Sequence, residues 1–155
     1  MTLKTYLTFL LVGGLFLFTA CEEEGINPRF VPAELKDDLN ARHPDAKGVE
    51  WELEGDVWEV EFVENGVDIG IIYDLDFTWI RTAWGISIDE LPTGAMEYID
   101  TNFPGGVIEE AEIFESSNEG DGYIAEVIFG KFEHEIFFDR DGNYLREEIE
   151  EDDGD

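Results

Sequence analysis

The chain has 155 residues and a formal net charge of −30, because 39 acidic residues outnumber 9 lysines and arginines. Nucleic-acid binding depends on lysine and arginine to displace the counterions of the phosphate backbone, so this charge excludes nucleic acid as a partner. Aromatic residues make up 14% of the chain, enough apolar surface to predict a folded core despite the acidity.

The N-terminus has the organisation of an export signal. An apolar run from Tyr6 to Ala20 follows Lys4 and ends at Cys21. The run is shorter than the ~20 apolar residues of a membrane-crossing helix, and it has the length of a signal peptide's apolar region. Its end resembles the bacterial lipoprotein signal, which is cut before a cysteine that carries lipid. We therefore predict a signal peptide over residues 1–20 and lipidation at Cys21; a soluble secreted protein and a short membrane anchor are the alternatives.

The predicted anchor places the protein in the cell envelope. Cys21 is the only cysteine, so the chain has no intramolecular disulfide and must fold on its core. Residues 21–30 are predicted to form an acidic spacer after the lipidated cysteine. More than one acyl chain gives stable anchoring, so we expect membrane contact through the lipid alone. The predicted location is the outer membrane, on its periplasmic or surface face.

Residues 31–81 and 91–146 have similar residue types in the same order. Val31-Pro32 corresponds to Leu91-Pro92, and Tyr73-Asp74 corresponds to Phe138-Asp139. Each segment is predicted to begin with a short helix, since proline suits the first helical turn. A second proline ends each helix, because proline disfavours helix at the residue before it.

Strands are predicted after each helix. Apolar residues alternate with acidic ones from about Trp51 onwards, and Asn65-Gly66 is a strong hairpin signal. Alternation with one acidic face indicates an antiparallel sheet with one wet side. We therefore predict an α+β fold, a tandem repeat of a short helix followed by about four antiparallel strands, with the helix packed on one sheet face. The two copies would share either an interface or a continuous sheet. Residues 82–90 would be a linker, and residues 147–155, seven of them acidic, a disordered tail.

Part of the second segment resembles a known family. Leu91-Pro92, Ala95, Tyr98-Ile99 and Phe103-Pro104, followed by acidic alternating strands and a turn at Asp141-Gly142, are similar to the PepSY-like family. These exported or lipid-anchored proteins are common in Bacteroidetes and related to the beta-lactamase-inhibitor-protein fold. The resemblance covers roughly residues 31–146. It implies a helix-plus-sheet protein without known chemistry, whose inhibitor relatives bind an enzyme on a concave sheet surface.

The residues predict no enzyme. Nucleophilic catalysis needs a nucleophile, a base and an orienting group. The candidates are few: Ser87, Ser116, Ser117, His43 and His134. None of the serines sits in a Gly-x-Ser-x-Gly turn. Paired carboxylates could serve a glycosidase, but 39 acids produce close pairs anywhere, so an enzyme on shared carboxylates stays a weak third option.

The metal-binding signals are weak. Asp139 and Asp141 resemble a calcium loop, but the glycine at 142 comes too early for an EF-hand. A hairpin turn is the preferred interpretation, and calcium stays the alternative. Strand alternation points His134 away from its two flanking glutamates, so a core histidine is expected there. We predict no cofactor, with calcium as the one candidate.

Apolar residues also occur on the sheet face that should be polar. They are Val63, Ile72, Ile80, Ile124, Ile128 and Phe137. A contiguous exposed apolar patch usually marks an interface. These residues are candidates for contact with a partner; burial within the chain or in a dimer is the alternative.

These observations lead to two hypotheses. The first is a non-enzymatic, lipid-anchored envelope protein that binds a protein or peptide, in the manner of an inhibitor. The second is a divalent-cation-binding or structural envelope protein that uses its acidic surface. The sequence names no particular partner.

Overall fold

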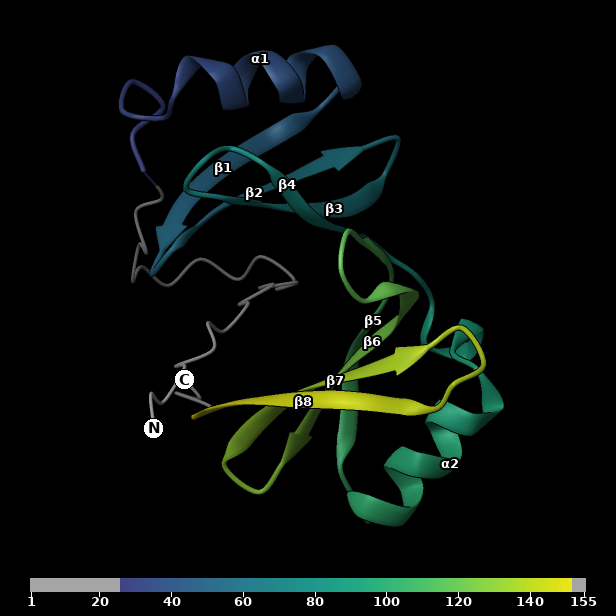
Figure 1. Ribbon diagram of the computed structural model, residues 1–155. Coiled ribbons are helices and arrows are strands. Elements are labelled where there is room, and N and C mark those ends of the chain that lie inside the picture. The colour runs from purple at the N-terminus through teal and green to yellow at the C-terminus, as the bar shows by residue number, and fades with distance from the viewer. Residues whose placement is uncertain (1–25, 152–155) are drawn as a thin grey trace. The chain divides into compact units, whose positions relative to one another are not determined.

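The computed structural model describes residues 26–151 (Figure 1). The predicted signal peptide, Cys21 and residues 22–25 of the spacer lie outside the described residues. No helix among residues 26–151 is long and apolar enough to cross a membrane.

The chain runs through two sets of elements. The first contains α1 (Ala33–Arg42), β1 (Lys47–Glu54), β2 (Val57–Glu64), β3 (Val67–Asp74) and β4 (Trp79–Gly85). The second contains the 3-10 helix η1 (Ile88–Glu90), α2 (Thr93–Asn102), β5 (Val107–Ser116), β6 (Gly120–Phe129), β7 (Phe132–Asp139) and β8 (Tyr144–Glu151). Both α-helices follow a proline and end just before His43 or Phe103, as the prolines predict.

The eight strands form one sheet in the order β1 to β8. The predicted fold class, a tandem repeat of helix-plus-four-strand units, is therefore wrong: residues 26–151 form a single eight-stranded antiparallel sheet with two α-helices. Alternation of apolar and acidic residues locates strands along the chain, but it does not say where a sheet ends. Continuing a sheet from one strand to the next leaves fewer unpaired edges than ending it.

Residues 26–84 and 85–151 belong to two compact units, and each has its own core. In the N-terminal unit, Leu35 and Leu39 of α1 pack with buried residues of the strands, among them Trp51, Val60 and Ile71. Successive side chains of a strand point to opposite faces of the sheet, and the buried ones of β1–β3 pack against α1, so α1 covers one face of this part of the sheet.

The core of the C-terminal unit is built in the same way from different residues. Ala95 and Ile99 of α2 pack with Val127, Ile136 and Phe138 of the strands. All five side chains are at most 3% exposed. The small side chain of Ala95 lets the helix approach the sheet closely.

Turns and irregular pairings fix the register of the hairpins. Asn65 and Gly66 both have positive φ, 56° and 83°, as a two-residue hairpin turn requires. The pairing shifts between Ile72 and Tyr73 on β3, opposite Ile80, and between Phe137 and Phe138 on β7, opposite Leu145.

Strand β8 extends to Glu151, so residues 147–151 are not the disordered tail that their acidity predicted. Each of them pairs with a residue of β7, from Glu147 opposite Ile136 to Glu151 opposite Phe132. Pairing with a strand rich in aromatic residues outweighs the repulsion among the glutamates. Residues 152–155 lie outside the described residues.

Candidate functional site

The strands of the C-terminal unit have a second face, opposite the one that packs on α2. Cross-strand register and alternation assign these residues to it: Glu110, Glu112, Phe114, Ile124, Glu126, Ile128, Glu133, Glu135, Phe137, Arg146 and Glu148. We call this set the second face. It combines carboxylates, apolar side chains and one arginine, which makes it the candidate functional site.

One row of the second face consists of carboxylates alone. Glu110 pairs with Glu126, Glu126 with Glu135, and Glu135 with Glu148, so four neighbouring strands each contribute a glutamate. Neighbouring strands lie ~4.8 Å apart, so these side chains are close. Glu126 and Glu135 are only 5% and 3% exposed. Like charges placed side by side across strands are destabilising, and burial increases that cost.

The neighbouring carboxylates of this row shift the pKa of Glu126. Burial, and then the negative charges of Glu110 and Glu112, raise the pKa of the Glu126 carboxyl to about 9. The charges of Glu133 and Glu109 act in the same direction. Glu126 therefore holds a proton at neutral pH, and its carboxyl group can donate a hydrogen bond as well as accept one.

The adjacent row changes from charged to aromatic across the sheet. Glu112 pairs with Ile124, Ile124 with Phe137, and Phe137 with Arg146. The ring of Phe114 meets the ring of Phe137 edge-on, with their centroids 5.8 Å apart. Phe114, Ile124 and Phe137 are fully buried, so they act as an apolar floor rather than as exposed contacts.

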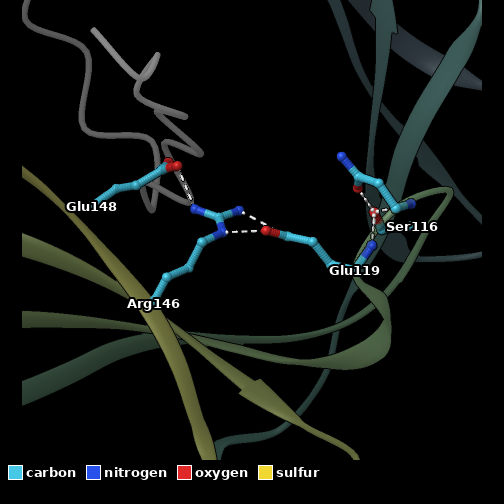
Figure 2. Close-up of polar contacts among 5 residues, drawn as sticks. Ser116, Glu119, Arg146 and Glu148 are labelled. Carbon is cyan, nitrogen blue, oxygen red and sulfur yellow. Dashed lines mark hydrogen bonds and ion pairs between the residues drawn. The ribbon is translucent and has the colours of Figure 1, made fainter. Parts of the chain in front are cut away.

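Arg146 lies over this floor in a fixed orientation. Its guanidinium carbon is 3.4 Å from the centroid of the Phe137 ring, within the range of a cation–π interaction. Nε donates to Glu119 Oε1 at 2.8 Å and Nη2 donates to Glu119 Oε2 at 3.2 Å, while Nη1 donates to Glu148 (Figure 2). The two-point contact with Glu119 is the geometry that a planar guanidinium favours.

The β5–β6 turn positions Glu119 for this contact. The Ser116 hydroxyl donates to Asn118 Oδ1 at 2.6 Å and accepts from the backbone N–H groups of Asn118 and Glu119 (Figure 2). Serine and asparagine are typical of turns because their side chains bond to nearby backbone groups. The Ser116 hydroxyl thus has a structural role in the turn.

The predicted partner-facing residues fall into two groups that belong to different units. Ile124, Ile128 and Phe137 share the second face, where Ile128 is partly buried. In the N-terminal unit, Val63 is 37% exposed, Ile72 is partly buried beside Arg81, and Ile80 lies at the irregular pairing of β4. Their role in partner binding remains a prediction.

Asp139 and Asp141 lie in the β7–β8 turn. Asp139 Oδ1 accepts from the backbone N–H groups of Asp141 at 2.9 Å and Asn143 at 2.8 Å. Hydrogen bonds from the Asn143 side chain and backbone lower the pKa of Asp139. Residues 26–151 contain no group of three or more histidine, cysteine, aspartate or glutamate side chains placed to hold a metal ion. Asp139 therefore stabilises its own turn.

His134 is a core histidine, as its place in the alternation predicts. It is 8% exposed, and its ring lies 4.9 Å from that of Phe103. Its Nδ1 is 2.6 Å from Glu147 Oε1. This pair joins β7 to β8 on the α2 side, away from the second face.

Sequence reasoning did not single out Arg146 or Glu126. A lone arginine in the strand sequence YLREEIEE was a usable signal, since one cation among four glutamates has neighbours to bond. Glu126 gave no signal, because its chemistry depends on glutamates from neighbouring strands.

Comparison with solved structures places the fold among proteins from Bacteroides. A DUF2874 family protein from Bacteroides uniformis aligns with a TM-score of 0.64 and 20% identity over 77% of this chain and 90% of that one. A structure from Bacteroides eggerthii, described as a predicted periplasmic protein, aligns with a TM-score of 0.65 and 20% identity over 77% of this chain and 89% of that one. A BLIP-like protein from Bacteroides fragilis aligns with a TM-score of 0.60 and 22% identity over 81% of this chain and 90% of that one.

These likenesses establish the fold. The predicted resemblance to beta-lactamase-inhibitor-protein-like proteins of Bacteroidetes is confirmed at that level, whereas PepSY is not named among these structures. No family model and no curated protein matches the sequence.

Proposed function

We propose that the protein is an exported, lipid-anchored, non-enzymatic module that binds a protein or peptide of the cell envelope. The observation that carries this proposal is the Arg146–Phe137 pair, which Glu119 and Glu148 hold in one orientation. Arginine and aromatic side chains are enriched among residues that dominate binding energy. A side chain already held in place loses little entropy when a partner binds.

The accessible members of the second face support the same role. Ile128 is partly buried and the Arg146 side chain is 30% exposed, so both an aliphatic group and an ordered cation can reach a partner. The likeness to a BLIP-like protein and to a predicted periplasmic protein supports an inhibitor-like binder outside the cytoplasm. Lipidation at Cys21 rests on the sequence alone.

A non-enzymatic role agrees with what the second face contains. Its ionisable groups are glutamates and one arginine, and the nearby Ser116 hydroxyl is engaged in the β5–β6 turn. Nucleophilic catalysis requires a nucleophile beside a base, and no such pair is formed by these residues.

The calcium alternative has less support. Asp139, its best candidate ligand, already accepts hydrogen bonds within its own turn from Asp141 and Asn143. A melting series in millimolar calcium, with Asp139→Asn and Asp141→Asn variants, would decide it. A rise in melting temperature that both substitutions remove would favour the cation-binding role.

The proposed function is tested by affinity capture. The full chain, purified in mild detergent and immobilised, would be incubated with solubilised envelope extract, with and without calcium, and bound proteins identified by mass spectrometry. The Arg146→Ala variant removes the ordered cation. Arg140→Ala is its matched control, because Arg140 is a surface arginine that pairs with Asp121 outside the second face.

We expect one protein to be enriched by the wild-type chain and the Arg140→Ala variant, and to be reduced at least about tenfold by Arg146→Ala, the loss typical of a dominant contact. Ile128→Lys should have the same effect. No enriched protein in either condition, or equal capture by all variants, would contradict the proposal.

A further inference from the structure

Strand β8 ends the sheet. It is the last strand in the sheet order, and it pairs with β7 in an unbroken run from Glu151 opposite Phe132 to Arg146 opposite Phe137. Within residues 26–151 the sheet order continues no further, so backbone groups on the outer side of β8 are available to another chain. A long, regular edge of this kind is a template for strand addition.

The other end of the sheet is protected. The N–H of Ile26 donates to the carbonyl of Trp51 on β1 at 2.6 Å, so a part of that edge is already bonded. The pairing of β1 also shifts between Lys47 and Glu50, which twists the strand. Coverage and bulges are the usual means of blocking strand addition, and the register of β8 from Arg146 to Glu151 contains no shift.

Exposed apolar side chains line β8. Ile149 is 55% exposed, Tyr144 is 42% and Leu145 is 41%. Ile149 pairs with His134, and Tyr144 stacks on Tyr98 of α2, so both lie on the α2 side of the sheet. A strand added beside β8 would bring its own side chains next to Ile149 and Tyr144 and cover them.

The charge of β8 restricts what can be added. Its sequence contains four glutamates and one arginine. A second copy of this chain would set glutamates against glutamates, and like charges opposite each other are destabilising. The chain's net charge of −30 likewise opposes an anionic lipid surface. The complementary occupant is a polypeptide with cationic residues.

We propose that the outer edge of β8 binds an extended segment of a partner protein, in which apolar residues alternate with lysine or arginine. Main-chain hydrogen bonds to β8 would supply much of the affinity, while side chains select the segment. Apolar side chains of the segment would cover Ile149 and Tyr144, and cationic ones would face Glu148 on the other side of the sheet. The inference rests on the proposed binding function, but it uses the backbone edge of β8 and shares only Glu148 with the second face.

A designed peptide of alternating lysine and valine, seven residues long with blocked ends, is the probe. Its affinity for the full chain would be measured by calorimetry, and amide hydrogen exchange would identify the protected strand. The variant is Ile149→Glu. Leu53→Glu on β1 is the matched control, because Leu53 is an exposed aliphatic residue of the opposite end strand, at 45%. Thermal melting checks that both variants fold.

We expect the peptide to bind, to protect amides of β8, and to bind Ile149→Glu about tenfold more weakly, whereas Leu53→Glu changes affinity less than about twofold. A glutamate–valine peptide and a lysine–valine peptide with alternate N-methylated amides should both fail to bind. Absence of binding at millimolar peptide, equal loss in both variants, or protection of a strand other than β8 would overturn the inference. Dimerisation of the chain through β8 would overturn it as well. If the peptide fails while affinity capture through Arg146 succeeds, the edge is excluded and the proposed function stands.

Discussion

Two rows of residues cross the strands of the two units and differ in charge. In the N-terminal unit the row is Glu50, Glu61, Gly70 and Ala83. In the C-terminal unit it is Glu110, Glu126, Glu135 and Glu148. In the first row two of the four strands contribute an uncharged residue, whereas in the second row every strand contributes a carboxylate. In the second row, burial and neighbouring negative charges raise the pKa of Glu126 to about 9, a consequence that Gly70 and Ala83 cannot have. Departures of this kind are expected at functional sites.

The largest effect is expected from Gly122→Ala in the C-terminal unit. A Cβ at this position would collide with the backbone oxygen of Phe138 and lie 3.0 Å from the Phe114 ring. We predict a loss of about 3 kcal/mol in the free energy of unfolding, since backbone cannot yield as a side chain can. Gly122 pairs with Asp139 as Val57 pairs with Asp74, so Val57→Gly is the counterpart. Urea denaturation should give a loss of only about 1 kcal/mol there, and equal losses would contradict this account.

The second prediction concerns the two turns that follow β3 and β7. Asp74 and Asp139 make the same backbone hydrogen bonds, but the residue with positive φ is Phe77 in one turn and Gly142 in the other. A Cβ on Gly142 would lie 2.9 Å from the backbone nitrogen of Ala95. Gly142→Ala should therefore cost about 2 kcal/mol, from strain at positive φ and from this contact.

Phe77→Gly is the comparison for that turn. Relief of strain at φ 64° opposes the loss of apolar contact, so we expect a change smaller than about 1 kcal/mol in either direction. Thermal melting of both variants measures the contrast. A loss at Phe77→Gly as large as that at Gly142→Ala would show that the two turns are equally constrained.

The helices, the hairpin turns and the side of each strand that faces a helix were predictable from local patterns. Prolines mark the helix starts, and Asn65-Gly66 marks a turn because both residues adopt positive φ. The single sheet could not be predicted with certainty, because alternation shows which residues of a strand face the core but not whether β5 continues the sheet beside β4. The close approach of the β7–β8 turn to α2 at Gly94 and Gly142 was hidden for the same reason.

The candidate site was predictable only in part. Alternation placed Ile124, Ile128 and Phe137 on one face of the sheet, and the pairing of β6 with β7 puts all three on the second face. The raised pKa of Glu126 was not predictable, because it depends on burial and on glutamates brought near by neighbouring strands. The orientation of Arg146 depends on Glu119, which lies 27 positions earlier in a turn.

The third prediction tests the carboxylate row directly. Glu126→Gln should raise the free energy of unfolding by about 2 kcal/mol at pH 8, because the neutral amide keeps the shape of the carboxyl group without its ionisation cost. Glu61→Gln in the N-terminal row is the matched control. Urea denaturation at several pH values provides the measurement.

The pH dependence fixes the sign of this effect. The pKa of Glu126 is raised from 4.5 to about 9 in the folded protein, so the unfolded chain loses its proton first as pH rises. The wild type therefore loses stability progressively between these two values, relative to Glu126→Gln. At pH 4 the two proteins should differ little. A difference that is the same at pH 4 and pH 8 would exclude the proton on Glu126.

The smallest effect is expected from Arg146→Ala. Its side chain is 30% exposed, so its ion pairs are partly screened by water, and we predict a loss of about 1 kcal/mol from the ion pairs and the contact with Phe137. Arg140→Ala, with a side chain 67% exposed, should change stability by less than about 0.5 kcal/mol. Similar values for both arginines in chemical denaturation would mean that Arg146 is no better ordered than a surface residue.

The central claim is that the second face binds a partner through Arg146, which is held over Phe137. The most direct test measures two quantities on the Arg146→Ala protein: its free energy of unfolding, and its capture of the envelope protein that the wild type enriches. The account predicts a protein that is only about 1 kcal/mol less stable but captures at least about tenfold less of that partner. Capture equal to that of the wild type would contradict it.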